Sequence, residues 1–354
     1  MSAGPEYAFV TAAPFIKEGA PRTSPSAVAR SRTLAPVSAL IELGYDARAY
    51  SLRAEHDLAA SLRNSKAIVL GDSPAGEDEG EWCYAELLAG VAADKVLLDF
   101  VAAPRLGTVR FDSYAGAFPR AAGLTAATQY VAAKLGPLAR RPVEVVADPF
   151  TGYPGEPRAV RPRRRSRALE WLAARAGVGA DAWRMRLLWI GEADGVASII
   201  ELAPHLQRLG REIPLALRCL CATGSGLDAL AEGLHEEDPD SLRLSIEAWS
   251  PMASAHALAT CDLVLLPGQT PAHASRLIAA LCAGRFAVCH SSPDYEALGE
   301  FAWVGNDLAE GIRWALSHPE EVLARLGRAQ DYVGRVHAPA AVARAWIEIF
   351  RKIA

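Results

Sequence analysis

The stretch PGQTPAHASRLIAALCAGRFAVCHSS, residues 267–292, decides the fold class of this 354-residue chain. It starts at the end of a short apolar run, passes through a loop and an amphipathic segment, and ends in a second apolar run. Thr270 suits a helix N-cap, Pro271 a first helical position, and Gly284 the residue that closes the helix. The stretch therefore predicts strand, loop, helix and strand, the repeating unit of a parallel α/β sheet.

The same alternation runs through both halves of the chain. The predicted strands of the first half are YAFV (7–10), DARAYS (46–51), AIVLGD (67–72), VLLDFV (96–101) and VEVVAD (143–148). Those of the second half are RLLWIG (186–191), LALRCLC (215–221), LRLSIEAW (242–249), LVLLPG (263–268) and FAVCHS (286–291). Because helical segments separate the strands, we expect two Rossmann-like, doubly wound domains whose carboxyl edges face a cleft.

The run DPFTGYPGEPRAVRPRRRSR, residues 148–167, interrupts this alternation with prolines, glycines and arginines. We expect domains at 1–160 and 161–335, followed by a helix at 336–354. The basic cluster in this run has two interpretations, a solvated linker or a surface for an anionic partner or membrane. The last helix carries Val342, Trp346, Ile347 and Phe350 at helical spacing, which predicts one apolar face.

Composition narrows the class of protein. Hydrophobic residues make up 51% of the chain and charged residues 22%, so both halves can bury a core. A formal net charge of −4 argues against a general nucleic-acid binder. We see no secretory signal, no apolar run near the ~20 residues of a membrane helix, and no CxxC pair among six cysteines. The expected location is the cytoplasm, with the inner membrane surface as a peripheral alternative.

Two loops are candidates for a phosphate site. The helix that starts near Thr270 would present bare N–H groups and about half a positive charge, and His273, Ser275 and Arg276 add donors in its first turn. The loop of LLWIGEADG (187–195) has the same form, and Gly191 would let the backbone approach a ligand. Every strand–loop–helix offers such an end, so the pattern alone is not specific.

Three further residues stand at predicted strand ends. Glu192 could bind a hydroxyl or act as a base, and it could equally be a solvated loop acid. Trp249 could cover a base or sugar ring or belong to the core, and Ser250 follows it. No GxGxxG, GxSxG, HExxH or P-loop pattern occurs, so the usual motifs of dinucleotide-binding proteins, α/β-hydrolases, zinc proteases and P-loop nucleotide hydrolases are missing.

The tract from about Arg186 to Phe350 resembles the C-terminal half of bacterial GT-B glycosyltransferases of the large retaining, glycogen-synthase-like group. Within that group it is most similar to a set found in cell-surface polysaccharide loci. The resemblance lies in LLWIGEADG, IEAWS, ALATCDLVLLP, the long tract SRLIAALCAGRFAVCHSSPDYEALGEFAWVGNDLAEGIRWALSHPEEVLAR, and VARAWIEIF. The first half resembles the acceptor domain more weakly, through ARSRTLAPVSALIELGYDARAYS (29–51) and VEVVADPF (143–150).

The resemblance implies a nucleotide-sugar donor on the second domain, an acceptor on the first, and a last helix that crosses back to the first domain. The donor side would comprise Gly191, Trp249, Ser250, His273, Ser275 and Arg276, with Glu192 as the catalytic residue. On the acceptor side we expect Arg30 and Arg32. No cofactor and no metal are expected, because no DxD is placed at a strand end.

The chain also departs from that family pattern. Ala279 stands where the relatives carry a glutamate that holds the ribose hydroxyls, and Ala272 lies near a position that is commonly basic. In the first half, VAAP (101–104) replaces acidic residues and a histidine.

Two functions stay open. One is a glycosyltransferase acting on a glycan, lipid-linked or protein acceptor. The other is a catalytically silent relative that binds an acceptor or stabilises a paralogous glycosyltransferase; a homodimer is also considered.

Overall fold

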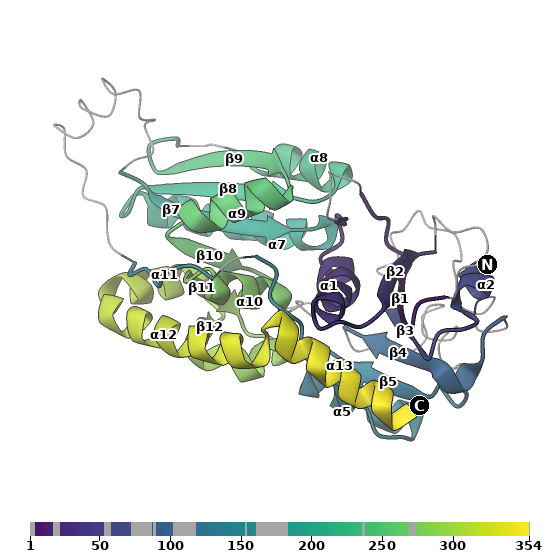
Figure 1. Ribbon diagram of the computed structural model, residues 1–354. Helices are drawn as coiled ribbons and strands as arrows, with labels where there is room; N and C mark the ends of the chain where they lie inside the picture. The colour runs from purple at the N-terminus through teal and green to yellow at the C-terminus, as the bar shows by residue number, and fades with distance from the viewer. Residues whose placement is uncertain are drawn as a thin grey trace. The chain divides into compact units, whose positions relative to one another are not determined.

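The computed structural model describes residues 4–16, 22–52, 58–71, 87, 90–101, 118–152, 154–160, 183–235, 238–268 and 274–353 (Figure 1). The chain divides into two compact units. The first comprises Met1–Thr151, His273–Ser275 and Gly334–Ala354, and the second comprises Gly152–Ala272 and Arg276–Val333. The main segment of the first unit thus ends inside the run 148–167, and the C-terminal segment belongs to that unit.

The first unit contains a parallel sheet in the order β2-β1-β3-β4-β5-β6. Its strands are β1 Tyr7–Thr11, β2 Ala47–Ser51, β3 Ala67–Gly71, β4 Val96–Phe100, β5 Gly123–Ala126 and β6 Glu144–Val145. The sequence predicted all of these except β5, whose four residues, GLTA, lack an apolar run. The strand predicted at 143–148 is only two residues long.

The second unit contains a parallel sheet in the order β12-β11-β10-β7-β8-β9. Its strands are β7 Met185–Gly191, β8 Leu215–Cys221, β9 Leu242–Ala248, β10 Leu263–Leu266, β11 Phe286–His290 and β12 Trp303–Gly305. The five predicted strands are confirmed, and β12 was missed because it has only three residues. Two parallel sheets with intervening helices confirm the α/β, doubly wound class.

Helices connect the strands in both units. In the first unit a π-helix, Ala29–Leu34, continues into α1 Ala35–Glu42, and α2 Leu58–Leu62, α5 Gln129–Ala139 and α13 Pro339–Ile353 follow. The helices after Gly152 are α7 Val196–Gly210, α8 Gly224–Gly233, α9 Pro251–Thr260, α10 Ser275–Cys282, α11 Leu308–Ser317 and α12 Pro319–Val336. Short 3₁₀ turns lie at Ala93–Lys95, Ala193–Gly195 and Pro293–Phe301. No helix of the described residues is both long and apolar enough to cross a bilayer.

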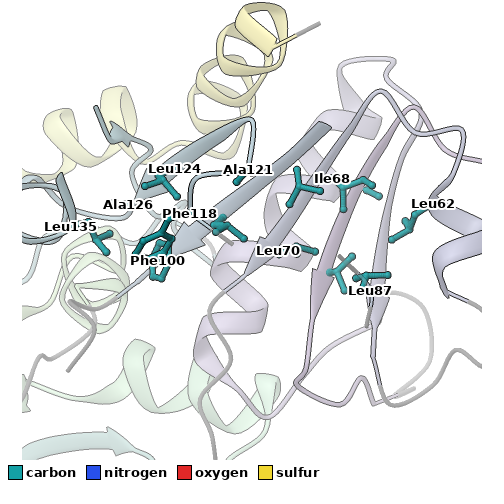
Figure 2. Packing of buried hydrophobic residues seen from close by; sticks show 14 of the residues in the cluster. Leu62, Ile68, Leu70, Leu87, Phe100, Phe118, Ala121, Leu124, Ala126 and Leu135 are labelled. Carbon is teal, nitrogen blue, oxygen red and sulfur yellow. The ribbon is translucent and has the colours of Figure 1, made fainter. Parts of the chain in front are cut away.

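The first unit buries both faces of its sheet because side chains alternate along each strand. Ile68 and Leu70 enter one layer together with Phe100 and Leu124, as Figure 2 shows. Val69 points the other way, into a layer that α1 and α13 cover. This arrangement fixes the strand register, since a shift by one residue would exchange the two layers.

The predicted apolar face of the C-terminal helix α13 packs on the first unit, the domain that the family resemblance implied. Trp346 is fully buried, and its ring meets Phe9 of β1 edge-on with centroids 5.2 Å apart. The ring of Phe350 stacks on Tyr7 with centroids 4.5 Å apart. The last helix is therefore part of the first unit's core, although it follows the whole second unit in sequence.

A buried ion cluster lies at the carboxyl end of the first sheet. Arg32, 1% exposed, donates from Nε to Oδ2 of Asp99 at 2.8 Å and from Nη1 to Oδ1 of Asp148 at 3.2 Å. The Thr125 hydroxyl donates to Oδ1 of Asp99 at 2.6 Å, and the Arg32 guanidinium lies 5.7 Å from the Trp346 ring centroid. Burial acts to lower the pKa of Arg32, but the two carboxylates outweigh it and leave the pKa raised.

Replacing Arg32 with Met should destabilise the first unit strongly. The change leaves Asp99 and Asp148 in the interior without their cation, and removing one partner of a buried pair costs about 3–5 kcal/mol. The matched control is Arg63→Met, at an exposed arginine of the same unit, which should change stability by less than about 0.5 kcal/mol. Urea unfolding measures both, and equal losses for the two variants would contradict the structural role of Arg32.

Candidate functional site

The second sheet reverses its order between β10 and β7. After β7 the chain moves outward to β8 and β9, and after β10 it moves the opposite way to β11 and β12. In open parallel sheets the connections that leave two strands at such a reversal run to opposite sides of the sheet, and a crevice forms at the carboxyl ends. In open α/β sheets ligands bind at this point, so the residues after β7 and β10 form the candidate site.

The loop after β7 is built on the indole of Trp189, which is 2% exposed. A Cβ at Gly191 would lie 2.0 Å from Cζ2 of this ring, and a Cβ at Gly195 would lie 3.3 Å from the same atom. Only glycine fits at position 191, because a side chain there would overlap the ring of Trp189. This reason for the glycine was not identified from the sequence. Gly191 itself is buried, whereas Gly195 is half-buried and leaves some backbone accessible, as a phosphate site needs.

Arg276 reaches this loop from α10. Its Nη1 lies 3.8 Å from the position that a Cβ would take at Gly195, and its side chain is half-buried. Within the described part of the chain, the Arg276 guanidinium makes no hydrogen bond or ion pair. Tyr295 is buried nearby; burial raises the pKa of its hydroxyl, and the Arg276 charge acts in the opposite direction. The site therefore holds a cation whose charge no described carboxylate neutralises.

Helix α10 begins at Ser275 and ends at Cys282. The predicted N-cap Thr270, the predicted first residue Pro271 and the donor candidate His273 lie outside the described residues. The predicted stop is confirmed, because Gly284 has a φ of +68° and its N–H donates to the carbonyl of Leu281. Ala279, half-buried, follows Arg276 by three residues, so both lie on one side of the helix.

Glu192 directly follows β7 and is half-buried. Its carbonyl accepts a hydrogen bond of 3.0 Å from the N–H of Gly195, which closes the turn that leads into α7. The structure thus places Glu192 and Gly191 in the same loop that Arg276 approaches. Its assignment as the catalytic residue stays a prediction.

Trp249 and Ser250 lie at the same carboxyl edge, after the outermost strand β9. The N–H of Trp249 donates to the carbonyl of Cys221 at 2.8 Å, and the N–H of Ala222 donates to the carbonyl of Gly191 at 3.2 Å. These two bonds link the loops that follow β7, β8 and β9. The Ser250 hydroxyl accepts from the N–H of Ala253 at 3.1 Å and so caps α9.

His290 is a residue of this edge that sequence reasoning did not single out. It ends β11, and its Nδ1 accepts a hydrogen bond of 3.0 Å from the N–H of Gly268, which follows β10. Burial lowers the pKa of His290, so the neutral ring needed to accept this bond is favoured. His290 therefore fixes the exit of β10, where Gly268 has a φ of +106°. Its position at a predicted strand end was the only available signal.

The two predicted acceptor-side arginines are engaged within the first unit. Arg30 donates from Nη1 to the carbonyls of Ser24 at 2.6 Å and Pro25 at 2.7 Å. Arg32 is enclosed in the ion cluster with Asp99 and Asp148. The donors of Arg32 point into the core, which supports a structural role for this residue. The assignment of Arg30 and Arg32 to the acceptor side stays a prediction.

Comparison with known proteins places the fold. The chain matches no protein-family model, and no curated protein matches its sequence. It does match solved glycosyltransferase structures, among them HepE of Anabaena with UDP and glucose, at a TM-score of 0.64, 10% identity, and coverage of 97% of this chain and 98% of that one.

Two further structures agree with this match. The glycosyltransferase of Rickettsia africae gives a TM-score of 0.59 at 12% identity, with 98% of each chain covered. WaaG, described as a glycosyltransferase involved in lipopolysaccharide biosynthesis, gives 0.57 at 17% identity, with 95% of this chain and 98% of that one covered. The chain thus shares the fold of these GT-B glycosyltransferases, two Rossmann-like domains, along nearly its full length.

The packing of Trp189 predicts different costs for two glycine substitutions. Gly191→Ala places a methyl group inside the indole ring and should lower the free energy of unfolding by about 1–3 kcal/mol. Gly224→Ala is the control, because nothing lies within 4 Å of a Cβ at that position in α8. It should leave stability unchanged or raise it by up to about 1 kcal/mol. Thermal unfolding of both variants checks the difference, and equal melting temperatures would contradict it.

Proposed function

We propose that this protein is a glycosyltransferase that moves a sugar from a nucleotide-sugar donor to a glycan, lipid-linked or protein acceptor. The observation that carries the proposal is Arg276, a half-buried arginine without a described ionic partner, placed beside a glycine loop at the strand-order reversal. An unneutralised arginine at this place suits a diphosphate, which accepts paired hydrogen bonds from a guanidinium.

Arg276 would act on the leaving group. As the bond between the anomeric carbon and the donor phosphate breaks, negative charge grows on the diphosphate, and a fixed cation stabilises that charge more than it stabilises the intact donor. The N–H groups of the first turn of α10, beginning at Ser275, add a partial positive charge of the same sign. His273, from the undescribed segment before α10, remains a proposed further donor.

The remaining roles follow from position. The half-buried backbone at Gly195, four residues after the buried Gly191, would let the diphosphate approach the β7 loop. Glu192 would orient an acceptor hydroxyl and accept its proton. Trp249 would cover the base or a sugar ring, while the Ser250 hydroxyl, which already caps α9, still has its proton to donate. These assignments require no metal ion.

The identity of the nucleotide and the biological process are proposed from similarity to other proteins. The HepE structures carry UDP, UDP with glucose, or UDP-glucose, so UDP is the first nucleotide to test. Sequence resemblance supports cell-surface glycan synthesis of the retaining kind, with the protein acting in the cytoplasm or at the inner membrane surface.

A second function, a silent acceptor-binding or stabilising partner of an active glycosyltransferase, is favoured by Ala279. A methyl group stands there on the Arg276 side of α10, so the ribose lacks the carboxylate that the family resemblance leads us to expect. Losing such a charged hydrogen bond weakens donor binding by about 1.5–3 kcal/mol, or roughly tenfold or more. The loss weakens a donor site without abolishing it.

Calorimetry with UDP, GDP, ADP and CMP tests the proposed site. At least one of these nucleotides should bind, and Arg276→Ala should weaken its affinity roughly tenfold or more, because the diphosphate loses its arginine. Arg208→Ala, at an exposed arginine near the end of α7, is the control and should leave affinity unchanged. If none of the four nucleotides bound, the proposed glycosyltransferase function would be refuted. If Arg276→Ala bound the nucleotide with unchanged affinity, the phosphate site would lie elsewhere.

Ala279→Glu should restore the contact to ribose. We expect this variant to bind the nucleoside diphosphate roughly tenfold or more tightly than the natural protein, since a carboxylate there accepts hydroxyl protons. Inorganic pyrophosphate is the matched ligand: it has no ribose and should bind Ala279→Glu no better than the natural protein. A variant that leaves nucleotide affinity unchanged would contradict the placement of the ribose beside Ala279.

A further inference from the structure

The strand β2 is the outer strand of the first unit's described sheet and pairs with β1 on one side. A groove of about 600 Å³ runs along this strand, and Ile41 of α1 together with residues 46–50 lines it. Exposed strand edges invite pairing with another chain, which proteins prevent or use. The groove is therefore a candidate docking surface.

The hydrogen bonds to β1 show which residues of β2 face outward. The carbonyl of Asp46 accepts from the N–H of Tyr7 at 3.0 Å, and the N–H of Leu52 donates to the carbonyl of Thr11 at 3.0 Å. Because N–H and C=O of one residue point to the same side of a strand, even-numbered residues face β1. Ala47 and Ala49, each 6% exposed, thus direct their N–H and C=O groups to the side of the strand that the groove follows.

The side chains on this strand carry a self-complementary charge pattern. Asp46 and Arg48 are both exposed, and the described residues offer neither of them an ion-pair partner. They lie on one face of the strand, two residues apart, with Ala47 between them. An antiparallel copy of the same strand, rotated about Ala47, would present the two charges in reverse order.

We propose that the outer edge of β2 pairs with β2 of a second copy of this chain, antiparallel, about a twofold axis at Ala47. The two Ala47 residues then form a hydrogen-bonded pair, as their outward groups require. Asp46 of each copy lies directly opposite Arg48 of the other, in the non-hydrogen-bonded positions where side chains approach most closely. The interface is isologous, and the two sheets become one.

The outward groups and the charges select this register together. Pairings that use the outward groups of Ala47 and Ala49 place the axis at residue 47, 48 or 49. An axis at Arg48 would oppose two arginines, and an axis at Ala49 would oppose Arg48 to Tyr50 and leave Asp46 without an opposite charge. Only the axis at Ala47 pairs both charges, and like charges directly opposite destabilise a sheet.

The side of the groove that α1 forms is also consistent with a second copy of the chain. Ile41, which lines the groove from α1, is 54% exposed. In the proposed dimer the twofold axis brings α1 of the second copy to this side of the sheet, where it would cover Ile41. This inference is independent of the proposed enzymatic function.

Charge reversal followed by charge exchange tests the interface. Asp46→Arg alone and Arg48→Asp alone each put like charges opposite twice in the dimer, and each should raise the dimer dissociation constant at least about tenfold. The double variant Asp46→Arg, Arg48→Asp restores both pairs and should restore the natural dissociation constant. Arg63→Asp, at an exposed arginine that does not line the groove, is the control and should leave it unchanged.

Sedimentation velocity over a range of protein concentrations gives the dissociation constants, and circular dichroism melts confirm that each variant is folded. The three substitutions, which make up the four variants, are at exposed positions, so folding should be preserved. A natural protein that stays monomeric at every concentration would overturn the proposal. Single variants that dimerise normally, or a folded double variant that stays monomeric, would overturn it as well.

Discussion

The reversal of strand order is the constraint on which the candidate site depends. Right-handed crossovers carry the chain from β7 outward through β8 and β9, and only by returning past β7 to β10 can the sheet grow on its other side. The return leaves neighbouring strands whose loops diverge. The buried ring of Trp189 packs against Gly191 and Gly195, and Arg276 approaches Gly195 from α10. The fold thus creates the crevice, and a few residues determine its chemistry.

The first sheet reverses in the same way between β1 and β3, and an arginine also lies there. The π-helix that carries Arg32 packs on both strands, and π-helical turns are frequent at special sites. Arg32, however, is saturated by Asp99, Asp148 and the carbonyl of Val146, whereas Arg276 has no described ionic partner. One arginine holds a domain together, and the other is available to a ligand. Arg32 lies on the helix after β1 and Arg276 on the helix after β10, each beside a reversal point. An arginine therefore serves stability in one unit and, we propose, phosphate binding in the other.

Sequence patterns predicted the elements whose signals are local. Apolar runs identified most strands, Gly284 identified the end of α10, and the spacing around Trp346 identified the buried face of α13. The short strands β5 and β12 escaped because three or four residues carry too little periodicity to detect. The pairing in the Arg32 cluster also escaped. Its carboxylates are 67 and 116 residues away in sequence, so only tertiary structure could show that this arginine is interior. Gly191 was noticed for its freedom of approach, but the ring of Trp189 two residues earlier is what excludes a side chain.

We propose that the reversal point of the second sheet binds the diphosphate of a nucleotide through Arg276. A crystal structure of the protein soaked with UDP tests it most directly. We expect difference density for two phosphates within hydrogen-bonding distance of the Arg276 guanidinium, beside Gly195. Density for UDP anywhere else on the chain, with the Arg276 guanidinium left without a phosphate, would contradict it.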